Sequence, residues 1–398
     1  MKNLLYLLVS LSIPIVFIYP QGLLYGTYLN YAFAVLCAIL LFLLPHNKNV
    51  GISLRFYLNI LMLNFFANLV SCIIGSVTPI QFLSGNAITI CAFCLSFIVS
   101  SFPSDKMHIL KGVMFLTTLL VVALIFLDGV SRPFWLYELF FLKNSVDYEN
   151  VGTIFQRAMG SLLSPVMAGF FCVCVATYYF VQSVYVKVSA VSLFFIAFSI
   201  LGLFLTGSRT AMLALLCMFL YFMCFYKFRN KHSILFFLLA GIFVFNFFDL
   251  SFLDDIIENL LFRNEQLSSG AFEGTGRTAT FMAAIENKFD IRCLFWGIGI
   301  SEYSLVENQE FSLAHNGFLS ILIPYGLVGL HLHYRLYKHY LIFNDSFYLD
   351  KLYLIFTSLW VIILLGTFFT ADLPVNHFSL CIQAIVLALA DRQKKIYR

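Results

Sequence analysis

Charged residues are scarce in this sequence, and their scarcity excludes a water-soluble globule. Only 11% of the 398 residues are Asp, Glu, Lys or Arg, whereas 61% are hydrophobic and the mean hydropathy is +0.91. A chain with so little charge cannot cover itself with a polar surface, so it has to be solvated by lipid. The sequence therefore predicts a polytopic membrane protein.

The sequence also lacks a disulfide framework and a metal-binding cluster. Nine of its 10 cysteines lie inside apolar runs, where a cysteine packs as a small apolar side chain, and Cys293 has no partner in a loop. The adjacent Asp254 and Asp255 point apart on a helix, and so do His331 and His333. There is no internal repeat. We expect neither a metal nor another cofactor.

What the sequence does contain is a series of long apolar runs. The lipid interior offers no water to unpaired backbone groups, so runs of about 17–25 apolar residues must be helices. The first run resembles a signal peptide, but no small-residue cleavage site follows it, so it is counted as a span. The predicted fold is all-α, a single transmembrane domain over residues 1–398. Its spans, about 12 in number, are 4–19, 23–44, 56–74, 84–102, 109–127, 164–185, 189–206, 210–226, 234–249, 316–337, 351–370 and 374–390.

The lysines and arginines predict on which side of the membrane each loop lies. Lys and Arg accumulate on the cytoplasmic side of membrane proteins. If the N-terminus is cytoplasmic, every short loop on that side is basic, and only a third of the 24 basic residues lie outside. Those outer residues are Arg132, Lys143, Arg157, Arg209, Arg263, Arg277, Lys288 and Arg292. Both termini are therefore predicted to be cytoplasmic.

Two long loops, 128–163 and 250–314, are predicted on the outer face. Apolar residues recur at helical spacing in 251–263 and 275–289, so the second loop should contain two amphipathic helices. The outer face is rich in carboxylates and still contains most of the arginines. Those arginines either form salt bridges with neighbouring carboxylates or bind a phosphorylated ligand.

Three outer arginines stand in surroundings that favour an anion. Arg209 lies at the start of a predicted helix between Ser208 and Thr210, where backbone N–H groups and hydroxyls add to its charge. Arg277 follows a glycine-rich stretch and opens an amphipathic helix, and Arg157 precedes the span that begins at 164. The alternatives are a lipid headgroup for Arg209 and a loop salt bridge for Arg157.

His315 and Asn316 lie where the second long loop meets the span 316–337. The unpaired N–H groups and the positive dipole end of that helix favour a neutral imidazole, which can accept a proton. The alternative is a histidine with a structural role at the membrane boundary.

Four short motifs together resemble the bacterial O-antigen polymerases (Wzy-type) and O-antigen ligases. They are RxxG followed by SP from Arg157, GSRT at 207–210, Gly276-Arg277 leading to FWGIGISEY at 295–303, and AHNGFLxxLxxYGLVG at 314–329. Each motif is weak alone, but their order and membrane side agree over residues 150–335. FWGIGISEY and HNGFLSILIPYG resemble polymerases more than ligases.

The resemblance implies a GT-C-like membrane glycosyltransferase without metal dependence, located in the bacterial inner membrane with its long loops in the periplasm. It implies that Arg209, Arg277 and His315 are catalytic. Arg157, Ser208, Thr210 and Asn316 would bind substrate. The donor and acceptor would both be oligosaccharides on undecaprenyl pyrophosphate, and a chain-length regulator and a flippase are possible partners. No nucleic-acid partner is expected. The alternatives are a ligase acting on lipid A core and, from another class, a lipid-linked oligosaccharide flippase.

Overall fold

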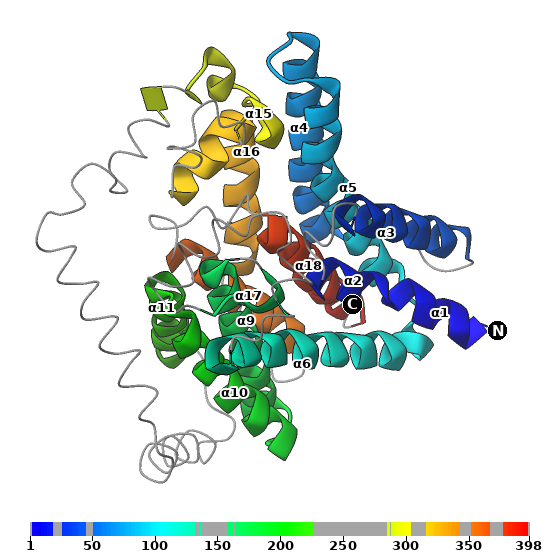
Figure 1. The fold of residues 1–398 in the computed structure, drawn as a ribbon, viewed down its shortest axis with the longest axis vertical. Helices are drawn as coiled ribbons and strands as arrows, with labels where there is room; N and C mark the ends of the chain where they lie inside the picture. Colours follow the sequence, from blue (N-terminus) through cyan, green and yellow to red (C-terminus); the bar gives the residue numbers. More distant parts are fainter. Residues whose placement is uncertain are drawn as a thin grey trace, which may run out of the picture. The chain divides into compact units, whose positions relative to one another are not determined.

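The computed structural model describes an all-helical chain (Figure 1). The described residues are 2–18, 26–44, 51–131, 136, 158–162, 164–225, 285–286, 288–303, 316–341, 352–366 and 377–396. Within these ranges there is no strand. The helices are α1 (Lys2–Ser10), α2 (Ser12–Ile18), α3 (Gly26–Leu43), α4 (Ile52–Ile73), α5 (Pro79–Ser101), η1 (Ser104–Lys106), α6 (Met107–Ser131), η2 (Gly160–Leu162), α9 (Pro165–Tyr185), α10 (Ala190–Thr206), α11 (Arg209–Phe225), η3 (Ile291–Leu294), α15 (Gly299–Tyr303), α16 (Gly317–Leu341), α17 (Leu352–Gly366) and α18 (His377–Ile396).

Each predicted span except 234–249 coincides with a helix, and the first is divided between α1 and α2. Among the described residues, five helical stretches are long and apolar enough to cross a membrane, namely Leu54–Ile73, Pro79–Ser101, Ser104–Ser131, Pro165–Tyr185 and Gly317–Leu341. The predicted all-α membrane fold is thus confirmed, and the number of spans stays a prediction. Residues 234–249 and most of 128–163 and 250–314 lie outside the described residues.

The chain divides into two compact units. The first comprises Met1–Thr117, Gly276–Asn344 and Leu364–Arg398, and the second comprises Thr118–Thr275 and Asp345–Ile363. In the first unit α5 packs against α3, α4 and α18, and α16 packs against α4. In the second unit α9 packs against α10 and α11.

Helix ends in the first unit are closed by specific side chains. Thr78 accepts a hydrogen bond from the N–H of Gln81, and the Gln81 side chain in turn accepts one from the N–H of Thr78, which forms a capping box before α5. At the other end of α5 the guanidinium of Arg392 donates to the carbonyls of Ser100 (3.2 Å) and Phe102. These carbonyls have no partner within the helix, so Arg392 fastens α18 to the end of α5.

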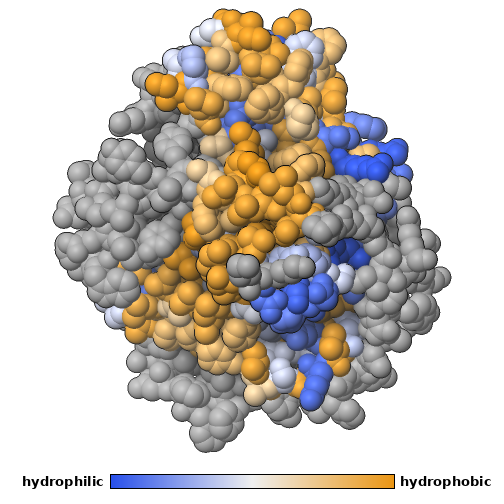
Figure 2. Space-filling model, turned by 90° about the vertical axis from the view of Figure 1, so that its right-hand side faces the viewer, coloured by the Kyte–Doolittle hydropathy of each residue, from blue (hydrophilic) through white to orange (hydrophobic). Residues whose placement is uncertain are grey.

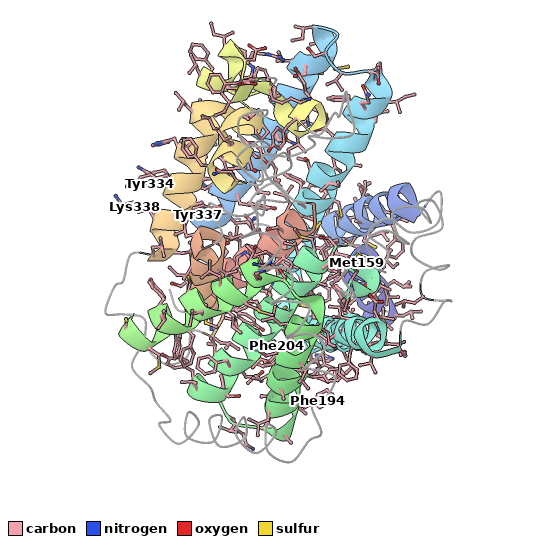
Figure 3. The ribbon with its side chains drawn as sticks, turned by 60° about the vertical axis from the view of Figure 1, so that its left-hand side comes forward. Met159, Phe194, Phe204, Tyr334, Tyr337 and Lys338 are labelled. Carbon is pink, nitrogen blue, oxygen red and sulfur yellow. The ribbon has the colours of Figure 1, made fainter. Side chains whose placement is uncertain are left out.

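Aromatic stacking joins the helices of the second unit. The rings of Tyr179 on α9 and Phe195 on α10 stack with centroids 4.5 Å apart, and those of Phe126 and Phe198 lie 4.6 Å apart. Ser189 caps α10 by accepting a hydrogen bond from the N–H of Ser192. Figure 3 labels Phe194 and Phe204 on the same helix.

Much of the described surface is hydrophobic, as the face in Figure 2 shows. On α11 the exposed large apolar residues are Leu213, Leu216, Phe219, Leu220 and Met223. Their spacing follows one side of a helix, and an exposed apolar side of this kind suits contact with lipid. On α16 the ammonium of Lys338 lies 5.6 Å from the centroid of the Tyr334 ring, and Figure 3 shows both residues towards the end of that helix.

Candidate functional site

Only Gly207 and Ser208 connect α10 to α11. Gly207 ends α10 in the left-handed conformation with φ 55°, which glycine adopts without strain. Ser208 follows, and α11 begins at Arg209. The prediction that Arg209 opens this helix is confirmed. Ser208 and Thr210 are buried, and the Arg209 side chain is partly exposed.

The hydroxyl of Ser208 serves the helix that it precedes. Its Oγ accepts a hydrogen bond from the N–H of Ala211 at 3.4 Å, and its carbonyl accepts one from Met212 at 3.0 Å. One of the N–H groups expected to bind an anion is therefore already partnered. The first turn of α11 still has its positive dipole end, and Arg209 adds a full charge there.

The start of α16 is capped by Asn316. Its Oδ1 accepts hydrogen bonds from the N–H groups of Phe318 (2.9 Å) and Leu319 (3.2 Å). Ser320 Oγ donates to the carbonyl of Asn316 at 2.7 Å, and its oxygen lies 3.5 Å from that of Tyr303. Asn316 thus fixes the helix start that directly follows His315. The role in substrate binding that the resemblance implies for Asn316 stays a prediction.

The short helix α15 contains the SEY end of the FWGIGISEY motif and is held by two asparagines of α4. Asn64 Oδ1 accepts from the N–H of Ile300, and Asn68 Oδ1 accepts from the N–H of Ser301, both at 2.9 Å. Ser71 Oγ donates to the carbonyl of Ile298 at 2.7 Å. These α4 side chains are buried and lie on one face of the helix. Sequence reasoning missed them, although polar residues at positions 64, 68 and 71 of an apolar span were a signal.

The loop before α15, called the WGIG loop after residues 296–299, is joined to the middle of α16 by backbone hydrogen bonds. The N–H of Ile298 donates to the carbonyl of Ile323 (3.0 Å), and the N–H of Val328 donates to the carbonyl of Phe295 (3.1 Å). Helix α16 is interrupted at Gly326, with φ 67° and ψ −171°. A straight helix would use these groups internally, so the interruption frees them for the loop. The continuous helix predicted over 316–337 is wrong at this point.

Arg292 lies at the centre of an ion-pair cluster beside α15. Its Nη2 lies 2.7 Å from Asp290 Oδ2 and 2.9 Å from Glu302 Oε1, and Nη1 donates to Ser71 Oγ at 3.1 Å. For this arginine, salt bridges to carboxylates account for a basic residue on the predicted outer face. The sequence left this alternative open.

Hydrogen bonds from Arg292 hold the pKa of the Asp290 carboxyl below its usual value. The stabilising contribution of Asp290 is therefore fully present above the usual pKa of an aspartate. It is lost only as the pH falls through the lowered value. This cluster should accordingly stay intact in mildly acidic solution.

We expect Arg292→Met to lower the apparent melting temperature in detergent far more than Glu302→Gln does. Removing the arginine leaves the mostly buried Glu302 carboxylate without its cation, and breaking a buried pair costs about 3 kcal/mol or more. In Glu302→Gln, Arg292 keeps its ion pair with Asp290. The control is Lys106→Met, because Lys106 lies 3.4 Å from Asp105, whose side chain is exposed, so that the pair is largely screened by solvent. Equal melting temperatures for Arg292→Met and Lys106→Met would contradict the assignment.

Four of the seven predicted site residues belong to described segments. Arg209, Ser208 and Thr210 come together at the α10–α11 junction of the second unit, and Asn316 caps α16 in the first. His315, Arg277 and Arg157 lie outside the described residues. Within the described part of the chain, no three His, Cys, Asp or Glu residues are grouped as metal ligands.

The fold and these junctions define an all-α, multi-pass membrane protein with polar residues gathered at helix starts. Residues 194–334 match the family model Wzy_C, described as O-antigen ligase. This confirms the resemblance to the O-antigen polymerase and ligase family over that segment. No curated protein matches the chain.

Proposed function

We propose that this protein is an O-antigen polymerase of the bacterial inner membrane. It transfers the growing glycan from undecaprenyl pyrophosphate to the next repeat unit on the same kind of carrier, at the periplasmic face. The observation that carries the proposal is the family match at 194–334, which encloses Arg209, Arg277 and His315. The described geometry supports it, because α11 begins at Arg209 and the cap of α16 directly follows His315.

The proposed reaction needs a base and an anion site. A hydroxyl oxygen of the acceptor sugar forms a bond to C1 of the donor sugar, and the bond from C1 to the pyrophosphate oxygen breaks. Undecaprenyl pyrophosphate leaves with the electron pair, and the hydroxyl proton passes to the His315 imidazole. The arginines compensate the negative charge that develops on the leaving group, so that no step requires a metal.

Each site residue has a part in this proposal. Arg209 and Arg277 bind the pyrophosphate, and Arg157 contributes a further cation. Ser208 and Thr210 shape the start of α11, where Ser208 caps the helix that presents Arg209. Asn316 sets the helix start next to His315. Both termini are cytoplasmic. A flippase and a chain-length regulator in the same membrane are partners of the protein.

The second candidate is an O-antigen ligase, which the description of the matched family favours. A ligase transfers the finished glycan to lipid A core, and a flippase would only move the lipid-linked unit across the membrane. The lipopolysaccharide gel pattern of a deletion strain separates these functions. A single repeat on core is expected for a polymerase. Polymer retained on the lipid carrier would instead identify a ligase, and loss of outer-face intermediates would identify a flippase.

Arg209→Lys is expected to lower transfer about ten- to a hundredfold, the loss of one charge-assisted contact worth ~1.5–3 kcal/mol. A lysine preserves the charge but cannot place two N–H groups on two phosphoryl oxygens at once. Transfer is measured with purified protein and lipid-linked donor. The control is Arg335→Lys, since the Arg335 guanidinium lies 5.7 Å from the Phe56 ring, a contact that an ammonium also makes. Unchanged transfer in both Arg209→Lys and Arg209→Ala would assign Arg209 to a lipid headgroup.

A further inference from the structure

Asp128, near the end of α6, is a buried carboxylate with backbone partners in the second unit. It is 2% exposed. Its Oδ2 accepts hydrogen bonds from the N–H groups of Met159 (2.6 Å) and Gly160 (2.9 Å). Burying an ionised carboxylate is costly unless hydrogen bonds compensate for the lost water. Two bonds to one oxygen provide that compensation, and they fix the backbone that makes them.

The segment 158–162, labelled at Met159 in Figure 3, is held on a second side by α10. The N–H of Ala158 donates to the carbonyl of Leu205 at 3.0 Å. Gly160 has φ 57°, and a Cβ there would lie 2.8 Å from Cγ1 of Ile125 on α6. Gly160 is therefore needed both for its backbone conformation and for its close approach to α6. The segment has one well-defined position between α6 and the last turn of α10.

This position bears on two arginines of the candidate donor site. Arg157 is the covalent neighbour of Ala158, so the two Cα atoms are about 3.8 Å apart. Leu205 lies in the final turn of α10, directly before the junction that leads to Arg209. The bond between Ala158 and Leu205 thus brings the backbone next to Arg157 to the same end of α10 from which α11 starts with Arg209.

We propose that Asp128 is a positioning residue of the donor site, which acts by holding the segment that directly follows Arg157 in sequence at the end of α10 that leads to Arg209. The inference rests on the proposed function. Two successive N–H groups beside a left-handed glycine form a concave anion site, and Asp128 occupies it. Pyrophosphate binding is then left to the arginines of the site. The carboxylate itself touches no substrate.

The test compares Asp128→Ala with Asp128→Asn in transfer from lipid-linked donor by purified protein. Both N–H groups bond to one oxygen, and asparagine retains one carbonyl oxygen, so Asp128→Asn should stay within about threefold of the wild type. Asp128→Ala should lose at least tenfold, mainly through a higher KM for the donor, because misplacing a binding group by about 1 Å can cost up to a hundredfold. Both variants should accumulate normally.

A double-mutant cycle with Arg157→Ala gives the sharper readout. If Asp128 acts through Arg157, Asp128→Ala should cause no further loss in the Arg157→Ala background. Full additivity would overturn the proposal, and so would tighter donor binding in Asp128→Ala, which would mean that the carboxylate excludes the anion. Equal losses in Asp128→Asn and Asp128→Ala would also overturn it.

A cross-link reports the position without using activity. A disulfide between Ala158→Cys and Leu205→Cys should form readily in the otherwise wild-type chain and in Asp128→Asn, and slowly in Asp128→Ala. Equal rates in all three would overturn the positioning role. An inert wild type in the transfer assay would instead refute the proposed function, and the cross-linking rates would still decide whether Asp128 holds the segment.

Discussion

His315→Ala is expected to slow glycan transfer by about 10²–10⁴-fold, the usual contribution of a general base. A sugar hydroxyl is a weak nucleophile near neutral pH, and its proton must leave as the new bond forms. Asn316 caps α16, so His315 directly precedes the positive end of a helix. We expect that field to disfavour a second proton on the imidazole, so that the ring can accept one.

The decisive measurement is transfer per folded molecule, accompanied by donor binding and protein level. His315→Ala should accumulate normally and still bind the lipid-linked donor. His108→Ala is the control, since His108 Nδ1 lies 3.1 Å from the carbonyl of Asp105 at an exposed position next to η1. A purely structural histidine predicts the opposite pattern, namely poor accumulation with near-normal turnover. Specific activity like that of the wild type would exclude His315 as the base.

Gly326→Ala is expected to damage folding severely, with a loss of roughly 3 kcal/mol or more from backbone strain and steric overlap together. The backbone of Gly326 has φ 67° and ψ −171°, a conformation restricted to glycine. A Cβ at this position would lie 2.2 Å from the carbonyl oxygen of Phe295, the acceptor of the Val328 N–H. The WGIG loop at Phe295 and the part of α16 around Gly326 would have to move apart.

The readouts for this substitution are the protein level in membranes and the apparent melting temperature in detergent. Gly112→Ala is the matched control. Gly112 lies in α6, and nothing lies within 4 Å of a Cβ placed there. Alanine favours a helix over glycine by about 1 kcal/mol, so this variant should equal or exceed the wild type in stability. A normal melting temperature in Gly326→Ala would show that the interlock of α16 with the WGIG loop is dispensable.

The helices could be predicted because lipid forces each apolar run to satisfy its own backbone. The start of α11 at Arg209 followed from the same rule, since a polar GSR sequence between two apolar runs marks a junction. The break at Gly326 could not be read in this way. Pro324 and Gly326 lie within an apolar run, and only the carbonyl and N–H groups of the distant WGIG loop make the interruption favourable.

The ion pairs of Arg292 and the buried Asp128 show a second limit of prediction from the sequence. Arg292 and Glu302 were recognisable as outer-face charges, but their pairing depends on the turn at η3, which hydropathy does not determine. Asp128 marked only the start of a loop in the sequence. Its partners are backbone groups around position 160, and backbone groups have no sequence signature.

The asparagines of α4 also constrain the order in which the protein is made. Asn64 Nδ2 donates to Thr89 Oγ1, and Asn68 Nδ2 donates to Asn86 Oδ1, so α4 and α5 can pair as soon as both have left the ribosome. The acceptor oxygen of Asn64 receives its α15 partner only 236 residues later in the chain. Until then the amide oxygens of the nascent helix pair that later accept from α15 lack that partner.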